Sequence, residues 1–145
     1  MIKLIIWFKP FARYLLVVWI IIIITISSIP SLPTMKIHTA KADIRLDYLI
    51  HFCEYGSLSF LAFLSFVEPD FKVRFRKFIL ISLSLIAFAV LDEFHQKLIP
   101  GRAFNVKDIW GDIMGIVTAI IFCTLVFRKV PEMGIRDSQA VKKNH

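Results

Sequence analysis

The strongest constraint on this chain is a series of four apolar segments, each close to the length needed to cross a lipid bilayer. They cover residues 14–29, 48–67, 75–91 and 109–127. A membrane-spanning helix needs about 20 mostly apolar residues, and the bilayer contains no water to satisfy an irregular backbone. The sequence therefore predicts an all-α, polytopic membrane protein with a bundle of four transmembrane helices, inserted in the cell membrane as a multi-pass protein.

Composition and charge agree with this prediction. Hydrophobic residues make up 57% of the 145 positions, and the mean hydropathy is +0.70. This is more apolar surface than one soluble core of that length requires. The chain has 18 Lys and Arg against 11 Asp and Glu, but the cations stand in short blocks between apolar segments. Such blocks are typical of membrane topology, so we expect membrane lipids and no nucleic acid as partners.

The basic residues also predict the orientation of the chain. Cytoplasmic loops of membrane proteins carry an excess of Lys and Arg, so the side with more of them should be cytoplasmic. Alternating the segments across the membrane puts twelve on the side of both termini and six on the other, which predicts cytoplasmic termini. The twelve are Lys3, Lys9, Arg13, Lys72, Arg74, Arg76, Lys77, Arg128, Lys129, Arg136, Lys142 and Lys143, and the six are Lys36, Lys41, Arg45, Lys97, Arg102 and Lys107.

The domain organisation follows from the same segments. We predict one four-helix domain over residues 1–130 and a flexible cytoplasmic tail over residues 131–145. An alternative is that the first segment is a cleaved signal peptide, because it has a basic start and is followed by an Ala40–Lys41–Ala42 triplet. Apolar regions of signal peptides run for about 7–15 residues and end close to the cleavage site. The triplet lies far beyond the apolar segment, which favours a transmembrane helix.

The second segment carries a polar face. His51, Glu54, Tyr55 and Leu58 follow the i, i+3, i+4, i+7 spacing of one helix face. An ionised carboxylate facing lipid is costly, so this face is predicted to point into the bundle. One interpretation is a functional site, because ionisable residues inside membranes usually serve function. The alternative is that His51 and Glu54 only hydrogen-bond neighbouring helices and hold the bundle together.

The third segment ends in two acids, an imidazole and an amide within about one helical turn. The spacing suggests that Asp92 faces His95 and that Glu93 faces Gln96. A solvated helix end would be the simplest explanation for one acid. It explains a cluster of this density less well, so the cluster is predicted to belong to a site.

Arg102 follows the turn made by Pro100 and Gly101. Its planar guanidinium suits two roles at this place. It can clamp the carboxylates of the third segment, or it can bind a carboxylate or phosphate of a ligand in bidentate geometry. Both roles place Arg102 at the mouth of the predicted site.

The fourth segment opens with a second polar face, formed by Asp108, Gly111, Asp112 and Gly115. The two glycines form a G-x-x-x-G pair that allows another helix to approach closely, within the chain or in a homo-oligomer. Asp108 lies in the first turn, where a carboxylate suits the helix dipole. Asp112 lies one turn deeper, and helix capping does not explain it.

Taken together, these motifs resemble the VanZ-like family of membrane proteins, named after a protein associated with resistance to glycopeptides (teicoplanin). The resemblance covers residues 26–120. It implies an envelope role and antibiotic tolerance, but it names no reaction. The family accepts Asn or Asp at the position of Asp112, which leaves a need for charge there open. The residues that carry it are Ser27-Ser28, His51-Phe52-x-Glu54-Tyr55 with Leu58, Asp92-Glu93-x-His95-Gln96, Pro100-Gly101-Arg102 and Asp108-x-x-x-Asp112-x-x-Gly115.

Three functions are compatible with these residues. The first is binding of an anionic, isoprenoid-linked envelope lipid or a peptidoglycan precursor, or control of access to it, at the extracytoplasmic face. The second is an enzyme acting on a lipid-linked envelope substrate by acid–base chemistry. The third is a small transporter or proton relay, for which four helices provide a narrow path unless subunits associate.

The enzyme hypothesis assigns roles to particular residues. Glu54, Asp92 or Glu93 would be the general base, and His51 or His95 the acid or the orienting group. A metal variant uses His51, Glu54, Glu93 and His95 as ligands, but no paired spacing defines such a site. No cofactor is identified. The candidate catalytic residues are thus His51, Glu54, Asp92, Glu93 and His95, and the candidate ligand-binding residues are Tyr55, Gln96, Arg102, Asp108 and Asp112.

Overall fold

The computed structural model of the chain describes residues 2–31, 36–38, 43–45, 47–68, 70–102 and 104–143. The fold is all-α, as predicted, with one additional short pair of antiparallel strands in which Ile37 is opposite Ile44. The elements are α1 (Ile2–Phe8), a 3-10 turn η1 (Lys9–Phe11), α2 (Ala12–Ser27), β1 (Lys36–His38), β2 (Asp43–Arg45), α3 (Asp47–Phe66), α4 (Phe75–Leu98) and α5 (Val106–Lys143).

Four helical stretches are long and apolar enough to cross a membrane, which confirms the four predicted segments. They are Leu4–Ser27, Asp47–Phe66, Phe75–Leu98 and Val106–Val130. The third is longer than the apolar run that predicted it, so its last two turns contain the acidic cluster, as expected. The Ala40–Lys41–Ala42 triplet lies outside the described residues.

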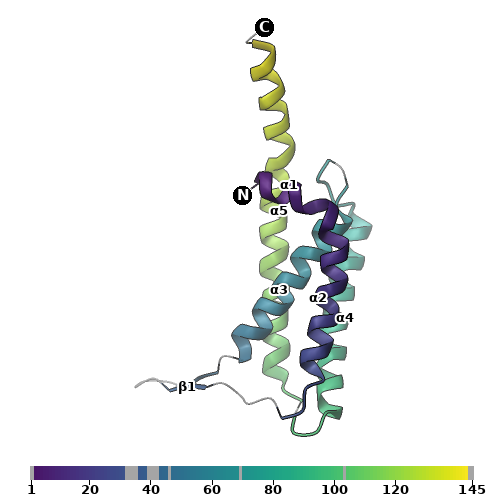
Figure 1. Cartoon of the computed structure of the whole chain (residues 1–145), viewed down its shortest axis with the longest axis vertical. Helices are drawn as coiled ribbons and strands as arrows, with labels where there is room; N and C mark the ends of the chain where they lie inside the picture. The colour runs from purple at the N-terminus through teal and green to yellow at the C-terminus, as the bar shows by residue number, and fades with distance from the viewer. Residues whose placement is uncertain are drawn as a thin grey trace.

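The helices α2, α3, α4 and α5 run side by side, and α1 lies across one end of this bundle (Figure 1). The change of direction occurs at η1, where Pro10 lacks the N–H that a continuous helix would need. Both termini and the α3–α4 loop lie toward the same end (Figure 1). Most of the basic blocks therefore share one end, as the orientation argument requires. The assignment of that end to the cytoplasm stays a prediction.

The helix α5 is longer than predicted and projects beyond the bundle toward the C-terminus (Figure 1). Its backbone remains helical to Lys143, so the segment after Val130 continues a helix instead of forming an irregular tail. The predicted flexibility of that segment stays a prediction.

Glycine allows α5 to pack closely against α3. A Cβ atom on Gly115 would lie 2.3 Å from the carbonyl oxygen of Phe52 and 2.9 Å from the backbone nitrogen of Gly56. A Cβ atom on Gly111 would lie 3.1 Å from the carbonyl oxygen of Tyr48. The G-x-x-x-G face is therefore occupied within the chain. This corrects the suggestion that it offers a surface for a homo-oligomer.

The bundle has a buried interior and apolar outer faces. Tyr55, Phe63 and Ile116 are almost completely buried between the helices. In contrast, Leu83 and Leu125 are more than half exposed on the outside. Lipid chains would cover such outward apolar faces, whereas soluble proteins rarely expose apolar patches of this extent to water.

Candidate functional site

The predicted site lies at the end of the bundle away from the termini, where α2 and α4 end and where α3 and α5 begin. Two loops are joined there, because the backbone N–H of Ser31 donates to the carbonyl oxygen of Pro100 at 3.2 Å. Gly101 has a φ of 77°, and a Cβ atom on it would lie 2.2 Å from Ser31 Oγ. Only glycine suits this turn, and the turn directs Arg102 toward the end of α2.

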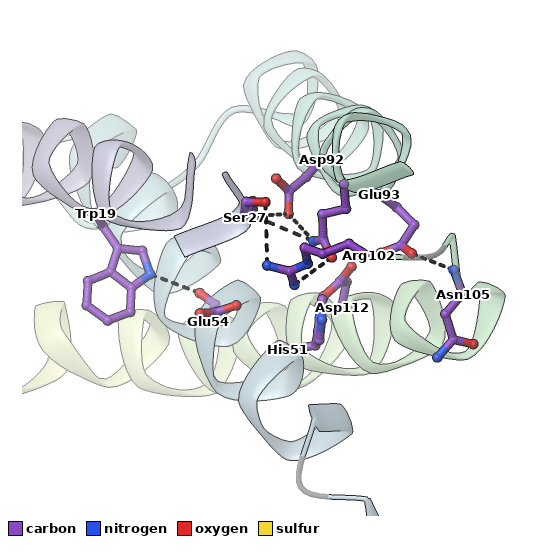
Figure 2. Close-up of polar contacts among 10 residues, drawn as sticks. Trp19, Ser27, His51, Glu54, Asp92, Glu93, Arg102, Asn105 and Asp112 are labelled. Atoms are coloured by element: carbon purple, nitrogen blue, oxygen red, sulfur yellow. Dashed lines mark hydrogen bonds and ion pairs between the residues drawn. The ribbon is translucent and has the colours of Figure 1, made fainter. Parts of the chain in front are cut away.

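The Arg102 guanidinium binds the end of α2 and one side chain of α4 (Figure 2). Its Nη1 donates to the carbonyl oxygens of Ile26 at 3.0 Å and Ser27 at 3.4 Å. Its Nη2 donates to Gln96 Oε1 at 2.8 Å. A cation at the C-terminus of a helix is favourable, because the last carbonyl groups carry negative partial charge. No carboxylate among the described residues accepts a hydrogen bond from Arg102, so the structure does not show the predicted clamp on the acidic cluster.

The Asp92 carboxylate is buried and connects α4 to α2. Its Oδ2 accepts hydrogen bonds from Ser27 Oγ at 2.9 Å and from Gln96 Nε2 at 3.1 Å. The predicted contact between Asp92 and His95 is wrong, because the partners of the Asp92 carboxylate are Ser27 and Gln96. His95 instead turns to α2, where its Nε2 lies 3.0 Å from Ser28 Oγ.

The Glu93 carboxylate points toward the start of α5. The contact with Gln96 that the sequence predicted is not formed. Only 1% of Glu93 is exposed. Its Oε1 accepts a hydrogen bond from the backbone N–H of Asn105 at 2.5 Å, and its Oε2 has no hydrogen-bond partner among the described residues. Asp108, in the first turn of α5, is also buried. Glu93 thus fixes the α4–α5 connection through Oε1, and its Oε2 can still accept a hydrogen bond.

His51 and Asp112 form a buried pair between α3 and α5. The distance from His51 Nδ1 to Asp112 Oδ1 is 2.9 Å, and the two residues are 7% and 1% exposed. Asp112 therefore has a partner on another helix, which accounts for the carboxylate that helix capping did not explain. The pair explains why a carboxylate can lie one turn inside α5.

Tyr55 lies one turn deeper than His51 and is completely buried. Its ring packs against Phe88 of α4, with the centroids 6.0 Å apart. Its hydroxyl lies near the Asp92 carboxylate without completing a hydrogen bond among the described residues. The polar face of α3 thus points into the bundle, as predicted.

Glu54 differs from the other acids because its side chain is only partly buried. Its backbone carbonyl oxygen accepts a hydrogen bond from Trp19 Nε1 of α2 at 3.0 Å (Figure 2). Its carboxylate makes no hydrogen bond among the described residues, although it lies within electrostatic range of His51, Asp92 and Arg102. Glu54 is therefore the acid of this region with the most freedom to receive a ligand or a proton.

The described side chains do not form a metal centre. No group of three or more His, Cys, Asp and Glu residues among them lies close enough to hold a metal ion. His51, Glu54, Glu93 and His95 are separated by their different partners, so the metal variant has no geometric support. The two cavities described below are lined by other residues, so the prediction that the candidate residues form one site stays a prediction.

A comparison with protein-family models identifies the family of the chain. A family model described as VanZ/LLP1 matches residues 4–128. The chain belongs to the VanZ/LLP1 family. The match includes all four membrane-spanning stretches almost completely, and it confirms the resemblance inferred from the motifs. Searches of curated proteins and of solved structures found no match.

Several contacts in this VanZ/LLP1 protein come from residues that the sequence did not single out as site residues. Ser27 and Ser28 belong to the motif at the end of the first segment, and their hydroxyl groups contact Asp92 and His95. The motif could have indicated these roles. Trp19 and Asn105 gave no comparable signal, because Asn105 acts through its backbone N–H and Trp19 binds a backbone oxygen.

Proposed function

We propose that this VanZ/LLP1 membrane protein binds the polar head group of an anionic envelope lipid or peptidoglycan precursor at the end of the bundle that carries Arg102. The observation that supports this proposal is that the Arg102 guanidinium has an N–H group without a hydrogen-bond partner among the described residues. Arginine has five N–H donors on three nitrogen atoms. In Arg102, only Nη1 and Nη2 donate hydrogen bonds to the described residues. Its Nε–H and its charge, which is not paired with a carboxylate by a hydrogen bond among the described residues, suit a phosphate or carboxylate.

The location supports a head group as the ligand. Arg102, Gln96 and the hydroxyl of Ser27 lie where helices end, and the ends of membrane-spanning helices reach the head-group region of a bilayer. The twelve-to-six distribution of basic residues predicts that this end lies at the extracytoplasmic face of the cell membrane. Glycopeptides bind precursor stems that end in a carboxylate. A protein that bound these stems, or altered access to them, would give glycopeptide tolerance.

Replacing Arg102 with lysine tests this proposal. Lysine keeps the charge but loses the planar fork, so we expect affinity for the anionic head group to fall by about 10- to 100-fold, the value of one or two charge-assisted hydrogen bonds. Retained lipids would be measured by mass spectrometry of the purified protein. Glycopeptide sensitivity would be measured in cells that contain equal amounts of each variant in the membrane.

The matched control is Lys97→Gln, which removes a cation from an exposed position at the same end of α4. It should leave both readouts unchanged. A thermal unfolding curve for each variant separates lost binding from lost folding, since Arg102 also contacts α2. An Arg102→Lys protein that retains lipid and tolerance at the wild-type level would exclude the anion site.

A second candidate function is acid–base catalysis on a lipid-linked substrate. It is favoured by Glu54, whose carboxylate has no hydrogen-bond partner among the described residues and lies one turn from His51, itself held by Asp112. A free carboxylate next to an oriented imidazole is an arrangement that proton transfer requires. Glu54 would be the general base, and His51 the group that returns the proton.

Replacing Glu54 with glutamine separates the two functions. Glutamine keeps the hydrogen-bonding shape of a protonated carboxyl group but cannot take up a proton. Binding should therefore persist within a factor of about three, whereas catalysis should fall by about 100-fold or more. The measurement is antibiotic sensitivity at matched membrane abundance. A fully active Glu54→Gln protein would eliminate Glu54 as a base and leave the binding function standing.

A further inference from the structure

A second region of interest lies on the side of the bundle where α2, α3 and α4 meet. A groove of about 520 Å³ runs there. Its lining is apolar over most of its length, with Leu16 and Ile20 from α2, Ala62 from α3 and Phe88 from α4. The groove is large enough for part of a lipid chain, and it lies between helices that are apolar enough to cross a membrane.

A basic cup lies at the end of this groove that is nearer the termini. Its volume is about 780 Å³, and its lining includes the cations Lys9, Arg13 and Lys77. Phe66 and Lys77 line both the groove and the cup. The two hollows are therefore adjacent, and a molecule longer than either one would extend from the groove into the cup.

The three cations of the cup are held in position by neighbouring oxygen atoms. Lys9 Nζ donates to the carbonyl oxygen of Glu68 at 2.8 Å, and Arg13 Nε donates to that of Ser65 at 3.4 Å. Lys77 Nζ lies 2.6 Å from Glu68 Oε1.

The net charge of the side chains that line the cup is positive. Glu68 is the carboxylate in the lining, and its hydrogen bond to Lys77 keeps its pKa below the usual range. It is therefore ionised at neutral pH and offsets one of the three cations. Lys9 and Arg13 donate hydrogen bonds only to carbonyl oxygens among the described residues, and Lys9 Nζ also lies 4.5 Å from the centroid of the Phe71 ring. Neither cation forms a salt bridge with a carboxylate among these residues, so both charges are available to an anion.

We propose that the groove and cup bind one phospholipid with an anionic head group, with an acyl chain between α2 and α4 and the phosphate at Lys9 and Arg13. The order of polarity matches that of the ligand, apolar at membrane depth and cationic at the helix ends. Basic pockets between transmembrane helices commonly bind anionic head groups. This site does not include Arg102, so a test of lipid binding here is independent of a test of the proposed function.

Native mass spectrometry of the full chain tests the proposal. The protein would be released from vesicles with equal amounts of phosphatidylglycerol and phosphatidylcholine carrying the same acyl chains. The wild-type protein should retain phosphatidylglycerol in preference to phosphatidylcholine. In a Lys9→Gln, Arg13→Gln double variant, retention should fall by about 25-fold, because each cation near a head group contributes about fivefold.

Three further variants complete the test. Lys72→Gln with Arg76→Gln removes two exposed cations outside both hollows, and should leave retention unchanged. Lys9→Arg with Arg13→Lys keeps the charges and should bind, even if the glutamine variant folds poorly. Ser84→Trp fills the exposed side of the groove and should reduce retention of the long-chain lipid. Three results would each overturn the proposal. The first is that the Lys72 and Arg76 control loses as much phosphatidylglycerol as the Lys9 and Arg13 variant. The others are that the wild-type protein retains phosphatidylcholine equally well, or that Ser84→Trp retains the lipid at the wild-type level.

Discussion

Replacing Gly115 with alanine is expected to lower the free energy of unfolding by about 3 kcal/mol, the upper part of the usual range for overpacking a buried site. The added Cβ atom would lie 2.3 Å from the carbonyl oxygen of Phe52 and 2.9 Å from the nitrogen of Gly56. Both are backbone atoms of α3 and cannot rotate away. The helices α3 and α5 must therefore separate, and His51 and Asp112 are held across the same interface.

The matched control for this prediction is Gly56→Ala, on the other side of the same contact. A Cβ atom on Gly56 would have its nearest neighbour, the carbonyl oxygen of Gly115, at 3.6 Å, which is ordinary van der Waals contact. Alanine is favoured over glycine inside a helix by about 0.5–1 kcal/mol, so this variant should be neutral or slightly stabilised. Unfolding of both proteins in the same detergent would be followed by circular dichroism. Equal stability of the two variants would contradict the close approach of α3 and α5.

Most of the fold could be predicted because bilayer thickness sets the length of apolar segments. The ends of the helices were harder to predict, since hydropathy falls where polar residues begin but the helix continues. The helix α4 keeps its hydrogen bonds through Asp92 and Gln96 because these side chains are buried against α2. The bend at η1 depends on Pro10, whose effect on direction cannot be seen in hydropathy.

The site was predictable to the level of helix faces and not of contacts. The spacing of His51 and Tyr55 correctly predicted that they face the interior. The partners of the acids depend on how the helices pack, which one sequence does not define. Asp112 pairs with His51 only because Gly111 and Gly115 bring α5 onto α3.

The structure also changes the interpretation of Arg102. Its contacts with the carbonyl oxygens at the end of α2 give it a structural role in joining α2 to the α4–α5 turn. The same contacts hold the guanidinium in one orientation, which lowers the entropy lost when a ligand binds. The structural and binding roles are therefore compatible. Only a variant that keeps the charge and changes the geometry can separate them.

Replacing Asp112 with alanine is expected to lower the free energy of unfolding by about 3–5 kcal/mol, as in other proteins in which one partner of a buried pair is removed. The His51 imidazole would lose the oxygen that lies 2.9 Å from its Nδ1. With 7% of His51 exposed, water can hardly replace that oxygen. The change also leaves a void between α3 and α5.

Asparagine at the same position keeps an oxygen that can accept a hydrogen bond from Nδ1–H and removes only the negative charge. If the pair acts mainly as a hydrogen bond, Asp112→Asn should cost about 1 kcal/mol or less, and lipid retention should persist. If the pair is an ion pair that orients His51 for proton transfer, Asp112→Asn should be nearly as unstable as Asp112→Ala and should lose function. Unfolding in detergent and antibiotic sensitivity at matched abundance would be measured on both variants. The binding function predicts that asparagine is tolerated and alanine is not, so an alanine variant with wild-type stability would show that the pair does not hold α3 to α5.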